Sequence, residues 1–437
     1  MSIHHPKIVY LTAGAAGMFC GSCLHDNSLV RALAEQGWDI QLVPTYTPIR
    51  TDETNVSIDH VLFGGLNVYL QQRIPLFRYL PSILDRFLDN PRLIRRVTSK
   101  AMETDAAMLG GLALSMLQGS HGNQRKEVRR MCRWLKQEKP DLLILTNLLI
   151  GGCLDQIKQD LNVPVLVTLQ GDDVFLDSLT SPFREKCMSQ IKKLVPLVDG
   201  FIVHSEFFRG SMSDYFEIDP AKIHVTPLGL DMRDYQRFLP GEIPTPPKSN
   251  RTIGYLARLA PEKGLQNLVE AFIQLKQRNE FVDLKLQVAG WLGPPNLSFA
   301  QSQWDRLNAA GLQSEYAYLG SFERAAKLDF LGEIDVLSVP TKYREPKGLY
   351  ALEALAAGIP IVVPDHGTFP ELIAQSSGGL LYSAENVSSL TETLSAILLD
   401  EGQRKRLGRD GQKYVHQFRN SVSMASSTGE LIKRFLR

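Results

Sequence analysis

Two glutamates separated by seven residues, Glu345 and Glu353, stand out in the second half of the chain. Pro346 suits the approach to a helix and Gly358 suits its end, which predicts a helix over most of the residues between them. This helix is apolar on nearly every side, so we expect it to be buried. A buried carboxylate such as that of Glu353 must be paired or hydrogen-bonded, and the two hydroxyls of a ribose would satisfy both of its oxygens.

The start of this helix also suits an anionic ligand. Gly348 has no side chain, so a ligand could approach the backbone N–H groups of the first turn, which favour phosphate. Two structural alternatives stay open on the sequence alone. Glu353 could pair with a neighbouring arginine, and Glu345 could merely complement the helix dipole.

A second candidate segment carries two cations, Arg258 and Lys263, between a predicted strand that ends near Ala257 and a helix that begins near Gly264. Such a loop lies at the carboxyl edge of a parallel sheet, where ligands bind. Breaking a sugar–phosphate bond leaves negative charge on a diphosphate, and two cations aimed at that charge would stabilise it. The alternative is an ordinary solvated, charged loop.

Short apolar runs alternate with amphipathic segments along most of the chain, which is typical of βαβ units and parallel sheets. Residues 239–250 interrupt this alternation with four prolines, so we interpret them as a linker. Strands are predicted over residues 7–12, 39–45, 141–146, 163–169, 201–204 and 223–227 before the linker, and over residues 252–257, 284–289, 317–319, 336–340 and 361–364 after it.

The pattern predicts an α/β chain of two doubly wound, Rossmann-like domains facing a central ligand cleft. Helices are expected over residues 24–36 and 206–216, the second capped by Ser205. The first domain would span residues 1–238 and the second residues 251–415. An insertion at about residues 47–123, with helical patterns at 82–93 and 105–117, is too long for a simple crossover.

The segment from Glu345 to Pro360 and the loop that carries Arg258 and Lys263 together resemble the retaining glycosyltransferases of family 4, which have the GT-B fold. That family carries two glutamates seven residues apart, an Ala-rich helix, a Gly-x-Pro turn and an Arg and Lys clamp for the diphosphate. Residues 319–322 resemble its turn facing the nucleotide base, and residues 364–371 resemble its loop before a late helix; the resemblance covers most of residues 251–385. The matching residues are Glu345, Glu353, Gly358, Pro360, Arg258 and Lys263.

The resemblance implies a role for each matching side chain. Glu345 would position the donor sugar, Glu353 would hold the ribose, and Arg258 and Lys263 would stabilise the leaving diphosphate in a metal-independent reaction that retains configuration. No other cofactor is implied, because the nucleotide sugar is a substrate, with a UDP-sugar as the family's default. A last helix within residues 416–437 would cross back to the first domain. The remaining expected donor-binding residues are Gly17, Gly348, Leu349, Tyr350, Ser321 and Phe322.

The first half matches the family less closely. Residues 14–17, Gly-Ala-Ala-Gly, look like its N-terminal glycine loop under the donor phosphates; they do not fit Gly-x-Gly-x-x-Gly, which argues against a dinucleotide-binding dehydrogenase. Gln170 and Gly171 stand where the family often has His-Gly, so Gln170 could contact the donor sugar without carrying a charge. His25, near the glycine loop, could contact donor or acceptor, or be a capping or partly buried histidine.

The cysteine content and the net charge bear on metal binding, on the cellular compartment and on nucleic-acid partners. Cys20 and Cys23 have metal-ligand spacing, but no second pair completes a tetrahedral site, so we expect structural thiols and no metal. Five cysteines, an odd number, do not suggest a disulfide framework and favour the cytoplasm. With 48 Lys and Arg against 47 Asp and Glu, nothing points to nucleic acid.

No uninterrupted apolar stretch is long enough to cross a bilayer, so we expect no transmembrane segment. The basic segment at residues 125–139 could lie on an anionic membrane surface, which would make the protein peripheral. We favour the alternative that this segment is the outer face of a helix packed on the sheet.

The sequence therefore predicts a glycosyltransferase that moves a sugar from a nucleoside-diphosphate sugar to an acceptor that the sequence does not name. The alternatives are another GT-B enzyme, such as a nucleotide-sugar epimerase or a phosphorylase, and a nucleotide-sugar-binding protein without catalysis. The sequence also does not predict the oligomeric state.

Overall fold

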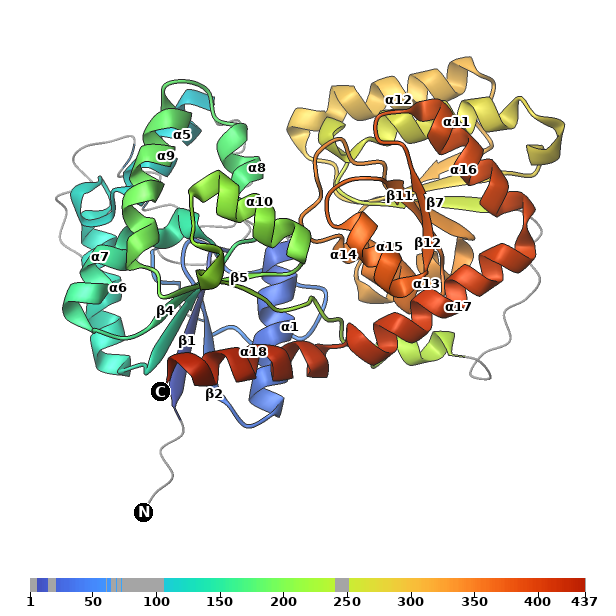
Figure 1. Ribbon diagram of the computed structural model, residues 1–437. Coiled ribbons are helices and arrows are strands. Elements are labelled where there is room, and N and C mark those ends of the chain that lie inside the picture. Colours follow the sequence, from blue (N-terminus) through green and yellow to red (C-terminus); the bar gives the residue numbers. More distant parts are fainter. Residues whose placement is uncertain are drawn as a thin grey trace. The chain divides into compact units, whose positions relative to one another are not determined.

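The computed structural model describes residues 6–14, 21–59, 61–63, 68, 72, 106–239 and 251–436. The chain divides into two compact units, Met1–Pro227 with Met424–Arg437, and Leu228–Ser423 (Figure 1). The C-terminal segment is therefore grouped with the first unit. Among the sequence predictions, Gly17, Cys20, the helical pattern at residues 82–93 and residues 240–250 of the linker lie outside the described residues.

The first unit is built on a six-stranded parallel sheet with the strand order β2-β1-β3-β4-β5-β6. Its apolar runs form strands because both faces are covered, and every residue of β3, β4 and β5 is buried. The strand order reverses between β1 and β3, so their carboxyl ends flank a topological switch point. The strands are β1 (Lys7–Thr12), β2 (Asp39–Pro44), β3 (Leu142–Leu145), β4 (Val165–Thr168), β5 (Gly200–Val203) and β6 (Ile223–Val225).

Local signals explain the helices of the first unit. Ser205 caps α10 as predicted, because its hydroxyl accepts a hydrogen bond from the Phe208 N–H at 3.2 Å. The basic helix α6 buries Val128, Met131 and Leu135 in the core, which agrees with a helix packed on the sheet. The helices within the described residues of this unit are α1 (Gly21–Glu35), α5 (Ala106–Leu117), α6 (Arg125–Glu138), α7 (Leu154–Asp160), α8 (Asp172–Asp177), α9 (Phe183–Leu194), α10 (Glu206–Phe216) and α18 (Ser421–Phe435).

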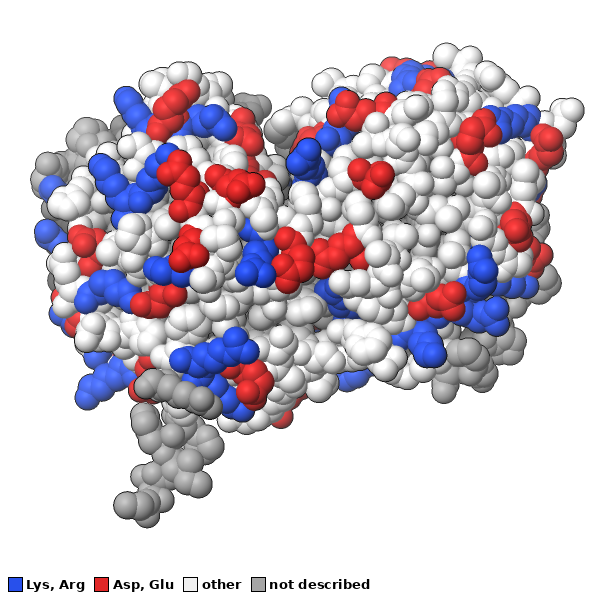
Figure 2. All heavy atoms as spheres, viewed as in Figure 1, with Lys and Arg blue, Asp and Glu red and all other residues white. Residues whose placement is uncertain are grey.

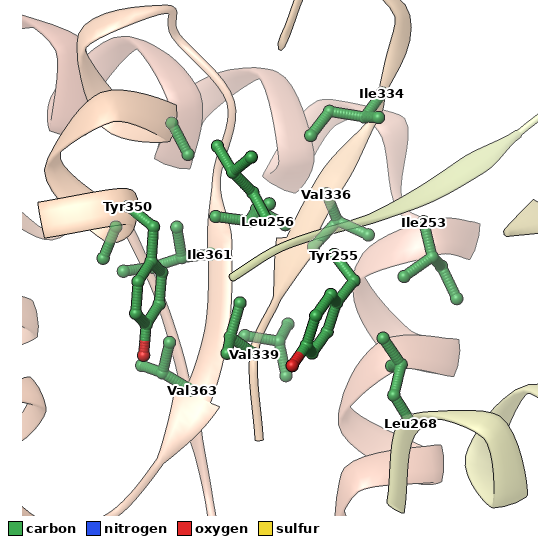
Figure 3. Packing of buried hydrophobic residues seen from close by; sticks show 14 of the residues in the cluster. Ile253, Tyr255, Leu256, Leu268, Ile334, Val336, Val339, Tyr350, Ile361 and Val363 are labelled. Carbon is green, nitrogen blue, oxygen red and sulfur yellow. The ribbon is translucent and has the colours of Figure 1, made fainter. Parts of the chain in front are cut away.

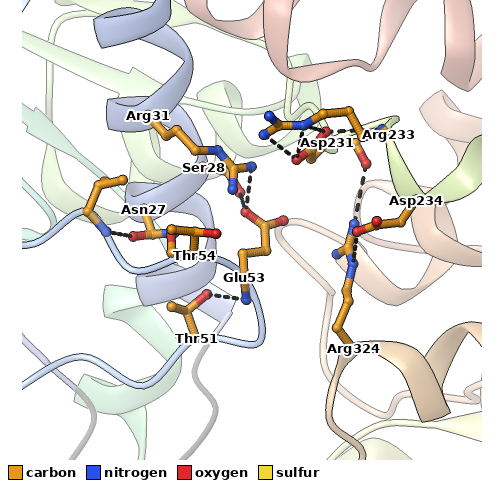
Figure 4. Close-up of polar contacts among 11 residues, drawn as sticks. Asn27, Ser28, Arg31, Thr51, Glu53, Thr54, Asp231, Arg233, Asp234 and Arg324 are labelled. Atoms are coloured by element: carbon orange, nitrogen blue, oxygen red, sulfur yellow. Dashed lines mark hydrogen bonds and ion pairs between the residues drawn. The ribbon is translucent and has the colours of Figure 1, made fainter.

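The C-terminal helix α18 belongs to the core of the first unit over most of its length. Met424 and Ile432 are buried in one apolar cluster with Ile8 and Tyr10 of β1. The loop after β2 is fixed to α1 by polar contacts, among them Glu53 Oε2, which accepts from Ser28 Oγ at 2.6 Å (Figure 4).

The second unit repeats the architecture with the strand order β12-β11-β10-β7-β8-β9, all parallel. The order reverses between β7 and β10, which places the switch point of this sheet at their carboxyl ends. Strand β12 was not predicted from the sequence. The strands are β7 (Thr252–Leu256), β8 (Lys285–Ala289), β9 (Tyr316–Tyr318), β10 (Val336–Ser338), β11 (Ile361–Pro364) and β12 (Gly379–Tyr382).

The core of the second unit buries the predicted Ala-rich helix. Tyr350 on α14 shares one apolar cluster with Tyr255 of β7 and with Ile361 and Val363 of β11 (Figure 3). Every residue of α14 after Leu349 is buried, as the sequence predicted. The helices are α11 (Leu265–Lys276), α12 (Leu297–Ala309), α13 (Arg324–Glu333), α14 (Leu349–Ala356), α15 (Phe369–Ser376), α16 (Val387–Leu399) and α17 (Glu401–Phe418).

Surface charge is mixed in sign on the face shown in Figure 2, where Lys and Arg alternate with Asp and Glu over both units. Among the described residues, none of the helices combines the length and the apolar character that a bilayer crossing requires.

Candidate functional site

Two loops at the switch point of the second sheet lie in direct contact. The first follows β7 and ends in the turn Pro261–Lys263; the second follows β10. Lys342 N–H donates to the Glu262 carbonyl at 2.9 Å, joining them. Gly264 has φ +77°, and a Cβ there would meet the Pro340 carbonyl oxygen at 1.7 Å. Only glycine therefore allows both the backbone conformation and this approach of the loops.

The loop contact brings Lys263 and Glu345 together. Lys263 Nζ donates to Glu345 Oε2 at 2.9 Å, and the Glu345 carboxylate is buried. Burial opposes ionisation of this carboxyl, but the charge and hydrogen bonds of its neighbours outweigh burial and hold the pKa of Glu345 below its ordinary value. The carboxylate is therefore charged at neutral pH and compensated by Lys263.

Two tyrosines also contact Glu345, and one of them, Tyr343, was not predicted from the sequence to have a role. Tyr343 OH donates to Glu345 Oε2 at 2.7 Å, and Tyr350 OH lies 3.4 Å from the same oxygen. Lys263 Nζ also donates to the Tyr343 hydroxyl oxygen and lies 4.8 Å from the centre of the Tyr343 ring. The position of Tyr343, two residues before Glu345, was the only sequence signal for this role.

Gly348 sets the start of α14 close to the same carboxylate. It has φ +65°, a left-handed conformation that favours glycine, and its N–H points to Glu345 Oε1 at 3.4 Å. Leu349, the first residue of α14, is half-buried, and Tyr350 follows it into the core. The helix thus begins beside Glu345, which is where the sequence placed it.

Arg258 lies on the same loop as Lys263 but has a different environment. Its side chain is 47% exposed, and Nη2 donates to Glu262 Oε1 at 2.5 Å. The structure therefore places Arg258 on the loop that carries Lys263, at the carboxyl edge of the sheet, with a guanidinium that is partly in solvent. An exposed ion pair of this kind is weak and could exchange its carboxylate for a phosphate at low cost.

Glu353 has a lysine partner inside the unit. Lys327 Nζ donates to Glu353 Oε1 at 2.6 Å, and both side chains are buried. This matches the structural alternative of a side-chain ion pair, with a lysine as the cation instead of an arginine. Sequence reasoning missed Lys327 because it lies 26 residues away on α13.

The predicted base-facing turn follows β9. Ser321 is exposed, and Phe322 is half-buried with its ring 5.4 Å from the ring of Phe330. Gly320, just before them, accepts a hydrogen bond from the Gly290 N–H at 2.8 Å, which ties this turn to the loop after β8. The turn therefore lies at the carboxyl edge of the same sheet as Lys263 and Glu345.

A buried polar network lies at the switch point of the first sheet, around Asp26 on α1. Tyr10 OH, Thr12 Oγ1 and Thr146 Oγ1 donate to its carboxylate at 2.7, 2.8 and 2.6 Å. Gln170 Nε2 donates at 3.0 Å, and His25 Nδ1 lies 3.1 Å away. Burial opposes ionisation of Asp26, but the contacts with His25 and the hydroxyls outweigh it and lower the pKa.

This network positions two predicted site residues of the first half. His25 is buried, with its ring 4.5 Å from that of His204, so the alternative of a buried histidine describes its state in the structure. Gln170 uses its side-chain amide to contact Asp26 and Thr146. Asp26 itself was missed, because it lies in the polar run His25-Asp26-Asn27-Ser28, which gives no signal of burial in the sequence.

Gly171 and Asp172 follow Gln170 at the end of β4. Gly171 has φ +109°, and Asp172 accepts from the N–H groups of Leu148 at 2.7 Å and Gln170 at 3.1 Å. Burial raises the pKa of Asp172 to about 6, in spite of these hydrogen bonds. The residue thus fixes two neighbouring loops while its own ionisation is disfavoured.

The described cysteines are buried thiols. Cys23, the described member of the Cys20 and Cys23 pair, is 2% exposed, and Cys132, Cys153 and Cys187 are also free and buried. Burial raises the pKa of Cys132 to about 12 and that of Cys187 to about 11. The environment of these thiols is that of structural residues.

Comparisons with known proteins cover both halves of the chain. A family profile described as Glycosyl transferases group 1 matches residues 242–414, and one described as Glycosyltransferase Family 4 matches residues 113–234. The D-inositol 3-phosphate glycosyltransferase of Corynebacterium efficiens is 27% identical over 252 residues, which are 55% of this chain and 57% of that protein. The chain thus spans a little over half the length of this relative.

Solved structures resemble the chain over nearly its whole length. Sucrose-phosphate synthase from Thermosynechococcus elongatus matches with a TM-score of 0.70 at 18% identity, covering 98% of each chain. Anabaena HepE in complex with UDP and glucose matches with a TM-score of 0.67 at 15% identity, covering 98% of this chain and 100% of that one. At these identities the likeness shows the fold, and it confirms the prediction of two Rossmann-like domains of the GT-B type.

Proposed function

The chain belongs to the GT-B glycosyltransferases of family 4, and from this premise we propose that it transfers a sugar from a nucleoside-diphosphate sugar to an acceptor with retention of configuration. One observation carries the proposal. At the switch point of the second sheet, the ionised carboxylate of Glu345 lies 2.9 Å from the Lys263 ammonium, beside the first turn of α14. A nucleoside-diphosphate sugar fits both charges, because a sugar hydroxyl can donate to the carboxylate while the adjoining diphosphate contacts the ammonium.

Lys263 and Arg258 bind the diphosphate in the proposed complex. Lys263 brings a compact ammonium, and Arg258 brings a planar guanidinium that suits phosphate oxygens. Both cations lie on the loop after β7 in the structure without a ligand, so the ligand does not have to bring them to the same loop. Their charge stabilises the diphosphate as its bond to the sugar breaks, so no metal ion is required for this step.

Glu345 orients the donor sugar. Its Oε1 has a contact of 3.4 Å with the Gly348 N–H, whereas Oε2 is occupied by Lys263 and Tyr343. Oε1 can therefore accept a hydrogen bond from a sugar hydroxyl. Since an ionised carboxylate forms a charge-assisted hydrogen bond, this contact fixes the ring with respect to the diphosphate.

The proposed reaction proceeds on one face of the sugar. The bond from the anomeric carbon to the phosphate oxygen breaks, and the acceptor oxygen bonds to the same carbon on the same face. The acceptor's proton passes to the departing phosphate, which receives the electron pair of the broken bond. No side chain acts as a nucleophile in this scheme, and the Lys263 ammonium stabilises the charge that develops.

Glu353 and the turn after β9 take the nucleoside in this proposal. Glu353 Oε1 is held by Lys327, so the ribose hydroxyls would donate to Oε2. Ser321 and Phe322 would face the base. HepE, a structure of the same fold, was solved with UDP and glucose, which supports a uridine nucleotide as the first donor to test.

We assign the acceptor site to the first unit. His25 and Gln170 lie on the Asp26 network, at the carboxyl ends of β1, β3 and β4, where ligands of open α/β sheets bind. Gly171 follows directly and, lacking a side chain, leaves the backbone accessible. These three residues are the proposed contacts for the acceptor or for the donor sugar.

The proposal is tested with a panel of UDP-, GDP- and ADP-sugars in a thermal-shift assay, followed by an acceptor screen with the donor that stabilises most. Nuclear magnetic resonance of the product should show the anomeric configuration of the donor. An inverted product would contradict retention. Binding without turnover on any acceptor would favour a binding protein, and a changed sugar without acceptor would indicate an epimerase. Absorbance of pyridoxal phosphate in the pure protein would indicate a phosphorylase.

A further inference from the structure

The two oxygens of the Glu345 carboxylate have unequal surroundings. Oε2 receives three donors, namely Lys263 Nζ at 2.9 Å, Tyr343 OH at 2.7 Å and Tyr350 OH at 3.4 Å. Within the described part of the chain, the partner of Oε1 is the Gly348 N–H, at the longer distance of 3.4 Å. The carboxylate is thus held through one oxygen and presents the other.

Lys263 has two tasks that compete in the proposed reaction. It compensates the buried Glu345 carboxylate, and it is also the cation that the diphosphate needs. If its ammonium moves toward the diphosphate, Glu345 loses its closest cation while negative charge arrives nearby. A buried carboxylate without compensation is costly, so another donor must hold it at that moment.

Tyr343 lies where such a donor is required. Its hydroxyl contacts both partners, because it accepts from Lys263 Nζ and donates to Glu345 Oε2. Burial, followed by the charge of Glu345, raises the pKa of Tyr343 well above its ordinary value, so the hydroxyl keeps its proton. A hydroxyl that donates to a carboxylate forms a short, charge-assisted bond.

We propose that Tyr343 is a positioning residue that retains Glu345 Oε2 while Lys263 transfers to the donor diphosphate, so that Oε1 stays aimed at a hydroxyl of the donor sugar. This inference rests on the proposed function and extends it by an exchange of partners at one oxygen. No bond is made or broken in the exchange. Tyr350, at 3.4 Å from Oε2, supports the same oxygen more weakly.

The surroundings of Glu345 determine what a pH experiment can report. Among the described residues, the charged and titratable groups that act most on Glu345 or on Tyr343 are Lys263, Arg258 and Glu262 from the loop after β7, and Tyr350 from α14. Lys263 and Tyr350 remain when the Tyr343 hydroxyl is removed. A change in the titration of Glu345 in such a variant therefore reports the loss of that hydroxyl.

The test is Tyr343→Phe, which keeps the ring under the Lys263 ammonium and removes only the hydroxyl. Tyr215→Phe is the matched control, because Tyr215 OH donates to the Asp177 carboxylate at 2.7 Å in the other unit. We expect Y343F to lower kcat by about 10- to 100-fold with a smaller change in KM, as the loss of a hydrogen bond to a charged group predicts. The acidic limb of the kcat/KM profile should move to higher pH by about one unit.

A second measurement does not depend on turnover. Carbon-13 labelling of glutamate carboxyls, with Glu345→Gln to assign the signal, reports the titration of Glu345 with and without UDP. The signal should titrate at higher pH in Y343F than in the wild type, and UDP should widen the difference. The Y215F protein should titrate as the wild type does.

The outcomes separate the inference from the proposed function. Wild-type kcat and an unchanged pH profile in Y343F, in an enzyme that turns over a nucleotide sugar, would overturn the role of Tyr343 and leave the proposed function standing. Absence of nucleotide-sugar binding by the wild-type protein would overturn the proposed function, and the role of Tyr343 with it.

Discussion

Lys327 Nζ lies 2.6 Å from Glu353 Oε1, and each side chain is 9% exposed. The pair links α13 to α14, so it fixes the helix that begins beside Glu345. The Glu353 carboxylate, which is proposed to bind the ribose, therefore also stabilises the fold.

Replacing Lys327 by methionine should destabilise the second unit, because it leaves the buried Glu353 carboxylate without its cation. The expected loss is about 3–5 kcal/mol in the free energy of unfolding, measured by denaturant titration. Lys405→Met is the control, since the Lys405–Glu401 pair is 71% and 65% exposed. A loss below about 1 kcal/mol in K327M would contradict the role given to this pair.

Gly264→Ala should separate the two loops of the candidate site. Its Cβ would meet the Pro340 carbonyl, so Lys263 must shift relative to Glu345, and we expect kcat/KM for the nucleotide sugar to fall by roughly 10- to 100-fold. Gly311→Ala is a matched control, because Gly311 has φ +74° and open space around its Cβ. Equal activity of the two variants would show that the loop contact is unimportant.

Asp172 should titrate near pH 6 in the folded protein, because burial raises its pKa to about 6 from an unfolded value of about 3.9. The folded protein then binds more protons than the unfolded chain between these values. This residue therefore makes stability fall as the pH rises from about 4 to about 6, by roughly 2–3 kcal/mol in total. Carbon-13 titration of the aspartate carboxyls, with Asp172→Asn for assignment, checks the midpoint, and a midpoint near 4 would refute it.

Thiol labelling under native conditions should be slow at Cys23, Cys132, Cys153 and Cys187, all of which are buried. At neutral pH a thiol with a raised pKa carries almost no thiolate, so burial and pKa act in the same direction. With five cysteines in the chain, no more than one should react quickly with a thiol reagent, and all five should react after denaturation. Fast reaction of two or more thiols in the native protein would contradict this account.

Much of the fold could be predicted because its strands are short apolar runs buried on both faces. The short apolar runs at β3 and β11 could be recognised as strands from the sequence alone, because strands buried on both faces consist of apolar residues throughout. In the structure every residue of both strands is buried. Strand β12 was missed because it opens with a glycine after Gly378 and has two half-buried residues, which reads as a loop.

The candidate site was predictable where spacing along the chain carries the geometry. The strand and helix patterns on either side of Arg258 and Lys263 placed both cations on the loop after β7, whereas the Lys263–Glu345 contact depends on β10 being the neighbour of β7 in the sheet. Contacts set by tertiary packing were not predictable in this way. Thr146 reaches Asp26 across 120 residues, and Lys327 reaches Glu353 from a different helix.

The central claim is that Glu345 and Lys263 act together on a nucleotide sugar. The most direct measurement is the turnover of the best donor and acceptor by wild type, Glu345→Gln, Lys263→Ala and the surface control Lys405→Ala. We predict that kcat falls by about 100-fold or more in E345Q and K263A and stays at the wild-type value in K405A. Wild-type turnover in both E345Q and K263A would contradict the account.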